Sequence, residues 1–326
     1  MKEYPGVSVV ITTYNEEQQL KLCLDSLKKQ DYPQEKIEIV LVDDKSTDNT
    51  VKIAKKYTDK IYYSGKRFCE ISRAAGIKNT NNELILFMDA DNILPNSGFL
   101  SNAVGAIMSE PDIVGSYPWR FHYNPKDPPS NRYCSLFGLN EPFQYYTRAK
   151  EHVSYMSNWD ILGTPADHGN YLTVEFPQGS NLTLGAIGFL TKKSLVEDKI
   201  YNEFFFHSDV FNELIHEGKN KFVLIKQEII HNHCRSSKVF FRKLARNFDN
   251  LLKYPNNRKS IWATKNKKLF VMSTIKMVSV IIPIKDAIRG FIKKPDLAWF
   301  LHPFYCFGVV AMYSYKTLHN KLTNLL

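Results

Sequence analysis

The stretch Glu83–Pro95, ELILFMDADNILP, decides the expected fold. Its five consecutive apolar residues, Leu84 to Met88, are typical of a strand that is buried on both faces, as in a parallel sheet. Two carboxylates, Asp89 and Asp91, follow one residue apart. At a strand end both can face a ligand, and oxygen ligands suit Mg²⁺ or Mn²⁺ that also binds a diphosphate. The alternative is a simple turn before Pro95, where Asp and Asn are common.

Strand-like and helix-like segments alternate on the N-terminal side of this stretch. VSVVITTY (7–14) and KIEIVLVDD (36–44) read as further buried strands, and EEQQLKLCLDSLKKQ (16–30) has apolar residues at helical spacing. Short alternating strands and helices predict βαβ units and an α/β fold with a mostly parallel sheet flanked by helices. The carboxyl ends of such strands line the ligand site. The polar residues expected there are Thr12, Tyr14, Asp43, Asp44, Asp89 and Asp91.

Composition and charge narrow the class of protein. A chain of 326 residues with 44% hydrophobic and 23% charged residues is globular, with room for one large or two modest domains. The segment from Lys219 to Lys294 holds 19 basic and 3 acidic residues, a local charge of +16, so the rest of the chain is near −6 against a total of +10. Such a block predicts a surface for phosphates of nucleic acid or of anionic lipid. Since no nucleic-acid recognition motif accompanies it, lipid is favoured and nucleic acid is not expected.

The five cysteines are widely spaced and form no CxxC pair, which argues against a disulfide framework and a zinc site. A reducing compartment is therefore expected. The N-terminus, MKEYPGVSVV, lacks the features of a signal peptide. These observations predict a cytoplasmic location.

The second half of the chain is less regular. Residues 118–177 are rich in aromatic residues, Pro and Asn, which predicts an elaborated loop region rather than a domain. A helix is expected where Val210, Leu214 and Ile215 recur, and an edge strand should follow it and end near IIHNHC (229–234).

The C-terminal part has the features of a membrane-binding region. KVFFRKLARNFDNLLKY (238–254) predicts an amphipathic basic helix with Phe240, Leu244, Phe248 and Leu251 or Leu252 on its apolar face. Two apolar tracts follow, Leu269 to Ile284 and Leu297 to Tyr315, and each is short or interrupted for a bilayer span. We expect a peripheral or monotopic association with an anionic membrane, or a short C-terminal membrane segment. The alternative is a helical lid that packs on the rest of the protein. The rings expected at headgroup depth are Trp299, Tyr305, Tyr313 and Tyr315.

Three ordered motifs, VSVVITTYNEE, IEIVLVDDKSTDNT and ELILFMDADN, resemble those of family 2 glycosyltransferases, in detail over residues 7–95 and more weakly to about 233. The resemblance implies the Rossmann-like GT-A fold. Residues 1–235 would form the catalytic domain, with 7–95 as the nucleotide-sugar-binding half and 96–235 as the acceptor half. Residues 236–326 would form a basic amphipathic and apolar membrane-associated helical region.

The resemblance also implies a nucleotide-diphospho-sugar donor, with UDP as the expected nucleotide, and Mn²⁺ or Mg²⁺ as the cofactor. By position, Thr12, Tyr14 and Glu16 would surround the base and ribose, and Asp44, with Asp43 beside it, would accept hydrogen bonds from the base. The alternative for Tyr14 and Asp43 is strand-end capping. The remaining implied donor-site residues are Arg73 near the nucleotide, Asp89 at the ribose or metal, Asp91 on the metal, and His233 on the metal or diphosphate. Ala74 departs from the family pattern, which commonly has Asn after the arginine.

The group that receives the acceptor proton is the main departure. Phe206 and His207 stand where the family commonly has an acidic pair, and of that pattern only Asp209 is kept. Asp209 or His207 acts as the base, or the acceptor is a phosphate that is already ionised. Asp209 can also be explained as a charge that stabilises a helix N-terminus.

The sequence therefore predicts an inverting, metal-dependent hexosyl- or N-acetylhexosaminyltransferase that acts on a lipid-linked or glycan acceptor at the cytoplasmic face of a membrane. The alternative is a catalytically degenerate nucleotide-sugar-binding scaffold protein at the membrane.

Overall fold

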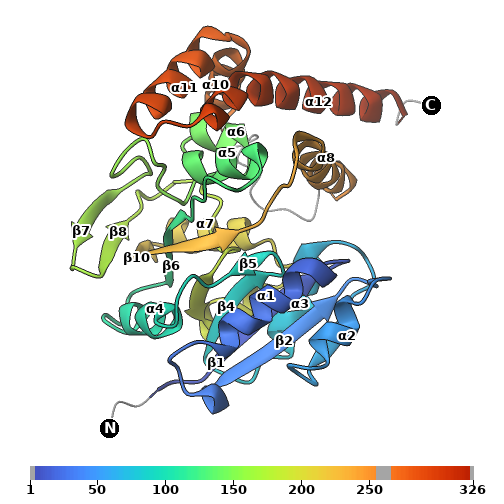
Figure 1. Cartoon of the computed structure of the whole chain (residues 1–326), viewed down its shortest axis with the longest axis vertical. Coiled ribbons are helices and arrows are strands. Elements are labelled where there is room, and N and C mark those ends of the chain that lie inside the picture. Colours follow the sequence, from blue (N-terminus) through green and yellow to red (C-terminus); the bar gives the residue numbers. More distant parts are fainter. Residues whose placement is uncertain (1–3, 255–265, 324–326) are drawn as a thin grey trace. The chain divides into compact units, whose positions relative to one another are not determined.

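The computed structural model describes residues 4–254 and 266–323, and the part of the basic segment at 255–265 lies outside the described residues. The chain forms two compact units (Figure 1). Unit 1 comprises Met1–Trp119, Leu162–Ser180 and Leu184–His231. Unit 2 comprises Arg120–Ile161, Asn181–Thr183 and Asn232–Leu326. The chain passes from unit 1 to unit 2 after His231, close to the domain boundary expected at 235. Residues 120–161, which were expected in the catalytic domain, belong to unit 2 with the C-terminal helices.

Unit 1 begins with the expected alternation of strands and helices. Strands β1 to β4 pair in parallel in the order β3-β2-β1-β4 (Figure 1). Their bounds are β1 Val7–Thr13, β2 Ile37–Asp43, β3 Ile61–Tyr63 and β4 Leu84–Asp89, and the helices between them are α1 Glu17–Lys28, α2 Thr50–Ala54 and α3 Cys69–Lys78. The apolar runs of β1 and β4 are buried on both faces, as the sequence predicts.

The register of this parallel half aligns the polar strand ends. Thr12 is the partner of Asp89 across β1 and β4, and Thr13 is the partner of Asp43 across β1 and β2. Helix α3 packs closely on β1, because a Cβ on Gly76 would lie 2.4 Å from Val10 Cγ1. A glycine is required at this position for α3 to approach the sheet so closely.

The sheet of unit 1 continues from β4 in the order β9-β6-β10-β8-β7, with β5 paired to β10. The pairs β4–β9, β9–β6, β10–β8, β8–β7 and β10–β5 are antiparallel. Its strands are β5 Asn92–Ile93, β6 Gly115–Phe121, β7 Thr164–Asp167, β8 Tyr171–Glu175, β9 Phe189–Lys192 and β10 Lys221–His231. The accompanying helices are α4 Phe99–Ile107 and α7 His207–His216, with short 3-10 turns at Gln34–Lys36, Lys193–Leu195 and Glu197–Lys199. The prediction that the strand after α7 lies at an edge of the sheet is wrong, because this strand, β10, lies between β6 and β8.

The helices of unit 2 correct the expectation of a loop region over residues 118–177. Two helices form in this stretch, and the β7–β8 hairpin comes from it as well. The helices of unit 2 are α5 Pro129–Phe137, α6 Pro142–Tyr146, α8 Ser237–Lys253, α10 Lys267–Val278, α11 Ile281–Lys293, η5 Leu297–Leu301 and α12 His302–Thr323. Proline stands in the first turn of α5 and α6, where its missing N–H costs nothing, so these prolines start helices.

Unit 2 has its own aromatic core, built by α5, α6 and the C-terminal helices. His302, which is 0% exposed, is bonded to the hydroxyls of Tyr133 at 2.9 Å and Tyr146 at 3.0 Å. The Tyr146 hydroxyl also lies 3.0 Å from Asp286 Oδ2 in α11. The polar residue that interrupts the last apolar tract is therefore a buried link between helices.

Helix α8 has the predicted apolar face, but this face packs on α12. Phe240 stacks on Tyr305 with ring centroids 4.3 Å apart, and Phe248 stacks on Tyr313 at 4.1 Å. The face is therefore not available to lipid. The prediction that Trp299 and Tyr305 lie at headgroup depth is wrong, because both rings are buried in the core of unit 2.

Within the described ranges, one helical segment, Leu297–Leu322, is long and apolar enough to cross a membrane by length and composition.

Candidate active site

Three side chains meet at the carboxyl ends of β1 and β4. The Thr12 hydroxyl donates to Asp89 Oδ1 at 3.0 Å, and Arg73 Nη2 of α3 donates to the same oxygen at 2.9 Å. Arg73 is 3% exposed, so its charge is compensated inside the protein by Asp89. Burial alone would lower the pKa of Arg73, but the acidic groups around it, Asp89 first among them, together outweigh burial and raise that pKa above its usual value. Arg73 therefore stays charged next to Asp89.

Helix α7 adds His207 to this group. Arg73 Nη1 lies 3.1 Å from His207 Nδ1. Because a guanidinium only donates hydrogen bonds, Nδ1 must be the acceptor, and in the neutral ring the proton is on Nε2. The structure thus brings together Arg73, Asp89 and His207, three of the residues expected at the site. In this arrangement Nδ1 is not free to take a proton from an acceptor.

The two acids after β2 have different surroundings. Both carboxylate oxygens of Asp43 hold the following turn, through the backbone N–H of Ser46 at 2.9 Å and its hydroxyl at 2.5 Å. Asp44 Oδ1 accepts from the hydroxyls of Ser64 and Ser72, the latter at 2.9 Å. Asp43 thus makes the capping contacts considered for it, while no hydrogen bond to Asp44 Oδ2 is found among the described residues.

Tyr14 and Glu16 lie in the loop between β1 and α1. The guanidinium of Arg67 lies 4.7 Å from the centroid of the Tyr14 ring, a cation–π contact. The backbone N–H of Glu16 donates to Thr50 Oγ1 at 2.9 Å. Nearby loop residues, Asn15, Lys45 and Arg67, have positive φ angles of 52°, 65° and 51°. Such backbone strain is concentrated at functional sites.

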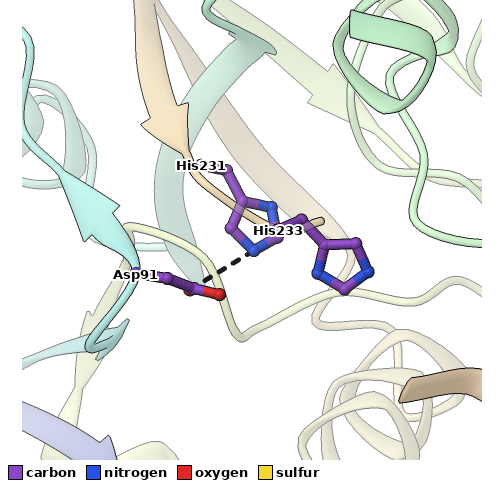
Figure 2. Close-up of side chains that lie close together, drawn as sticks. All are labelled: Asp91, His231 and His233. Atoms are coloured by element: carbon purple, nitrogen blue, oxygen red, sulfur yellow. Dashed lines mark ion pairs between the residues drawn. The ribbon is translucent and has the colours of Figure 1, made fainter. Parts of the chain in front are cut away.

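A group that can bind a metal lies at the end of β10 and just after β4. Asp91, His231 and His233 each offer one ligand atom, and these atoms lie within 4.8 Å of one another. In Figure 2 the ring of His231 points to the carboxylate of Asp91, and His231 Nε2 lies 3.5 Å from Asp91 Oδ1. The side chain of Asp91 also accepts from Asn92 Nδ2 at 3.2 Å. One carboxylate and two imidazoles suit a divalent transition metal such as Mn²⁺ better than Mg²⁺, which prefers oxygen ligands.

The metal group differs in one residue from the expected set of Asp89, Asp91 and His233. Asp89 lies with Thr12 and Arg73, and His231 takes a place in the group instead. The spacing of His231 and His233 carried the signal, since alternate residues at a strand end can face the same side. The Arg67 contact had no comparable signal, because it depends on how a loop folds back on Tyr14.

Asp209 and Phe206 lie at the start of α7. Asp209 is in the first turn and is 6% exposed. Phe206 stacks on Phe204 with centroids 5.4 Å apart and meets Phe68 edge to face at 5.9 Å. The aromatic side chain at the position of an expected acid therefore fills an apolar cluster.

Comparison with known proteins connects this geometry to a family. Residues 8–162 match the model described as glycosyl transferase family 2. The chain is 33% identical over 120 residues to dolichyl N-acetyl-alpha-D-glucosaminyl phosphate 3-beta-D-2,3-diacetamido-2,3-dideoxy-beta-D-glucuronosyltransferase of Methanococcus voltae, covering 33% of this chain and 37% of that protein. It is 37% identical over 93 residues to the poly(ribitol-phosphate) beta-N-acetylglucosaminyltransferase TarS of Staphylococcus aureus, covering 27% of this chain and 16% of TarS. The chain thus spans less than half the length of these curated relatives.

A solved structure supports the fold. The mannosyltransferase PcManGT of Pyrobaculum calidifontis, in complex with GDP-Man and Mn²⁺, superposes with a TM-score of 0.54 at 17% identity, covering 97% of this chain and 88% of that one. At this identity the likeness shows the fold alone, which is an α/β sheet flanked by helices, as in GT-A proteins. The match to the glycosyl transferase family 2 model covers residues 8–162 of this chain, and the likeness of fold agrees with that match.

Proposed function

We propose that this protein is a metal-dependent glycosyltransferase that moves a sugar from a nucleotide-diphospho-sugar, with UDP as the nucleotide, to a lipid-linked or glycan acceptor with inversion. One observation carries the proposal. Asp89, which pairs with the buried Arg73, ends strand β4, and Asp91 follows two residues later with its carboxylate beside His231. A fixed cation paired with Asp89, and a group of possible metal ligands that includes Asp91, suit the binding of a diphosphate.

The donor would bind along the carboxyl ends of β1, β2 and β4. Thr12, Tyr14 and Glu16 are proposed to surround the base and ribose, and Asp44 to accept from the base through Oδ2. Asp91, His231 and His233 would hold Mn²⁺, which would supply charge neutralisation of the departing diphosphate. Arg73 remains charged and is fixed by Asp89 and His207, so it can stabilise negative charge there without reorganising. PcManGT, which shares the fold, is a complex with GDP-Man and Mn²⁺.

Asp209 is proposed as the base that receives the acceptor proton. The Arg73 contact supports this choice over His207, because it occupies His207 Nδ1 and leaves the ring proton on Nε2. Asp209 lies in the first turn of α7 and its side chain is buried, so its position is well defined. His207 then acts as a positioning residue that holds the guanidinium of Arg73.

The acceptor is proposed to be lipid-linked, at the cytoplasmic face of a membrane. The names of the two relatives describe transfer to a dolichyl-linked sugar phosphate and to poly(ribitol phosphate). Residues 1–235 would carry the donor and acceptor halves, although 120–161 group with the C-terminal helices. The exposed apolar residues of those helices support a membrane location.

A donor screen tests this function. The protein is mixed with Mn²⁺ and single UDP- or GDP-sugars, and its unfolding temperature is followed. A true donor at a hundredfold excess over its dissociation constant stabilises the folded state by about 2.7 kcal/mol. Release of nucleoside diphosphate is then measured with the stabilising donor and membrane lipid extract. Stabilisation without release under every condition would favour the scaffold alternative, and stabilisation by no nucleotide would contradict a donor site.

A further inference from the structure

The exposed apolar side chains of this protein are concentrated on its C-terminal helices. Of the 18 large hydrophobic residues that are exposed in the described part of the chain, 15 lie between Val271 and Leu322. The other three, Leu22, Tyr63 and Met108, are scattered over unit 1. Single exposed apolar residues need no explanation, whereas a concentration of this kind marks an interaction surface.

Helix α11 shows the arrangement most clearly. Four isoleucines recur three or four residues apart, so they share one side of the helix, and they are 65%, 39%, 43% and 72% exposed: Ile281, Ile284, Ile288 and Ile292. The buried residues of α11 include the smaller Pro283, Ala287 and Gly290. A Cβ on Gly290 would lie 2.4 Å from Trp299 Cδ2, which shows how closely this inner side is packed. The large apolar residues thus point outward, the reverse of a helix in a soluble protein.

A row of basic residues runs beside the isoleucines. Lys285, Arg289 and Lys293 are exposed, and each follows one of the isoleucines by one position. The segment 267–322 contains nine basic residues and two acidic ones, Asp286 and Asp296. Neither acid is exposed, since Asp286 accepts from Tyr145 and Tyr146, and Asp296 pairs with Arg132 and Tyr123. The charge that these helices present to the outside is therefore positive.

Helices α10 and α12 lie beside α11 in unit 2 (Figure 1). They also carry exposed apolar residues. Their exposed large apolar residues are Val271, Met272, Ile275 and Val278 in α10, and Phe304, Phe307, Tyr315, Leu318 and Leu322 in α12. In α12 they recur three or four residues apart if the exposed Ala311 is included, so they also follow one side of the helix. The other side is held on unit 2 by buried His302 and by the ion pair of Lys316 with Asp249 at 2.6 Å. These contacts favour a helix that lies on a surface over one that leaves the unit to cross a bilayer.

We propose that α11, with the exposed residues of α10 and α12, forms a docking face for an anionic lipid bilayer, in which the isoleucine row enters the headgroup region and the basic row contacts lipid phosphates. Apolar residues flanked by lysine and arginine are the combination that binds helices in the plane of such a membrane. The face lies on α10 to α12, whereas the apolar face of α8 is occupied within the protein. The inference rests on the proposed function only for its purpose, which is to bring the enzyme to a lipid-linked acceptor.

Flotation of the full chain with lipid vesicles tests the docking face. Vesicles of phosphatidylcholine alone are compared with vesicles that also contain phosphatidylglycerol. We expect binding to the anionic vesicles that weakens with salt, and a loss of at least about tenfold in the double variant Ile284→Gln/Ile288→Gln. Replacing Lys285 and Arg289 by Gln should weaken binding by about fivefold per charge. The matched control Leu22→Gln/Met108→Gln, which removes exposed apolar residues from unit 1, should bind like the wild type.

Several outcomes would overturn the proposal. They are absence of binding to anionic vesicles, equal binding by the Ile284→Gln/Ile288→Gln variant, and a dimer in the absence of lipid that this variant converts to a monomer. The last result would assign the face to a second copy of the chain. Mn²⁺-dependent binding of UDP, measured on the same variants, separates this inference from the proposed function. If the Ile284→Gln/Ile288→Gln variant still binds UDP but no longer binds vesicles, the docking face is supported. If the wild type does not bind UDP, the donor site is contradicted and the docking face is not.

Discussion

The contact between His207 and Arg73 gives a prediction that separates positioning from proton transfer. Asparagine at position 207 can place an amide oxygen near the present site of Nδ1, so His207→Asn keeps an acceptor for Arg73. His207→Phe removes the acceptor, and His207→Gln moves it toward the site of Nε2. A hydrogen bond to a charged group contributes about 1.5–3 kcal/mol, which corresponds to a change of about tenfold to a hundredfold in affinity.

The assay is the dissociation constant of UDP in the presence of Mn²⁺, together with the pH profile of donor turnover. We expect binding to weaken about tenfold to a hundredfold in His207→Phe and to be largely restored in His207→Asn. The acidic limb of the pH profile should be the same in wild type and His207→Asn. The positioning role would be refuted if His207→Asn were as impaired as His207→Phe, or if it lost an acidic limb centred near pH 6.5, the usual pKa of histidine.

Three further predictions follow from other parts of the structure. Asp209→Asn should leave UDP binding unchanged and lower transfer by about 10²- to 10⁴-fold, and full transfer by this variant would exclude Asp209 as the base. Gly290→Ala should lower the free energy of unfolding by about 1–3 kcal/mol, because the added methyl group meets Trp299, whereas Gly105→Ala in α4, with nothing within 4 Å, should be neutral or stabilising. Burial raises the pKa of Glu141 to about 7. Since the unfolded chain then binds fewer protons than the folded one between pH 4.5 and about 7, stability should fall by up to about 3 kcal/mol as the pH rises through this window. The change in unfolding temperature between pH 5 and pH 8 should be smaller in Glu141→Gln, and an equal change would show that Glu141 is ionised throughout.

The N-terminal half of the fold was predictable because its determinants are local. The apolar runs of β1, β2 and β4 are continuous and end in polar residues, so both the strands and the position of Asp89 and Asp91 follow from short stretches of sequence. The region around 118–177 was not, because α5, α6 and the β7–β8 hairpin are stabilised by contacts with residues far along the chain. The prolines that begin α5 and α6 look the same in the sequence as prolines of a loop. The place of β10 inside the sheet depended on the same hairpin.

The sequence predicted which residues lie at the site better than it predicted which side chains contact one another there. Asp91 and His233 were expected to share a metal, and they do lie in one group of possible ligands. The replacement of Asp89 by His231 in that group follows from the pairing of Asp89 with Arg73, which brings together residues 16 positions apart on β4 and α3. The direction of the α8 face was also beyond the sequence, since an amphipathic basic helix has the same pattern on lipid and on protein.

We propose that Asp91, His231 and His233 bind the metal on which turnover depends. The most direct measurement is the release of nucleoside diphosphate from the donor as a function of Mn²⁺ concentration, in wild type, Asp91→Ala and His231→Ala. We expect saturable, Mn²⁺-dependent release by the wild type, abolition by a chelator, and a loss of release in both variants at Mn²⁺ concentrations that saturate the wild type. Full Mn²⁺-dependent release by Asp91→Ala would contradict it.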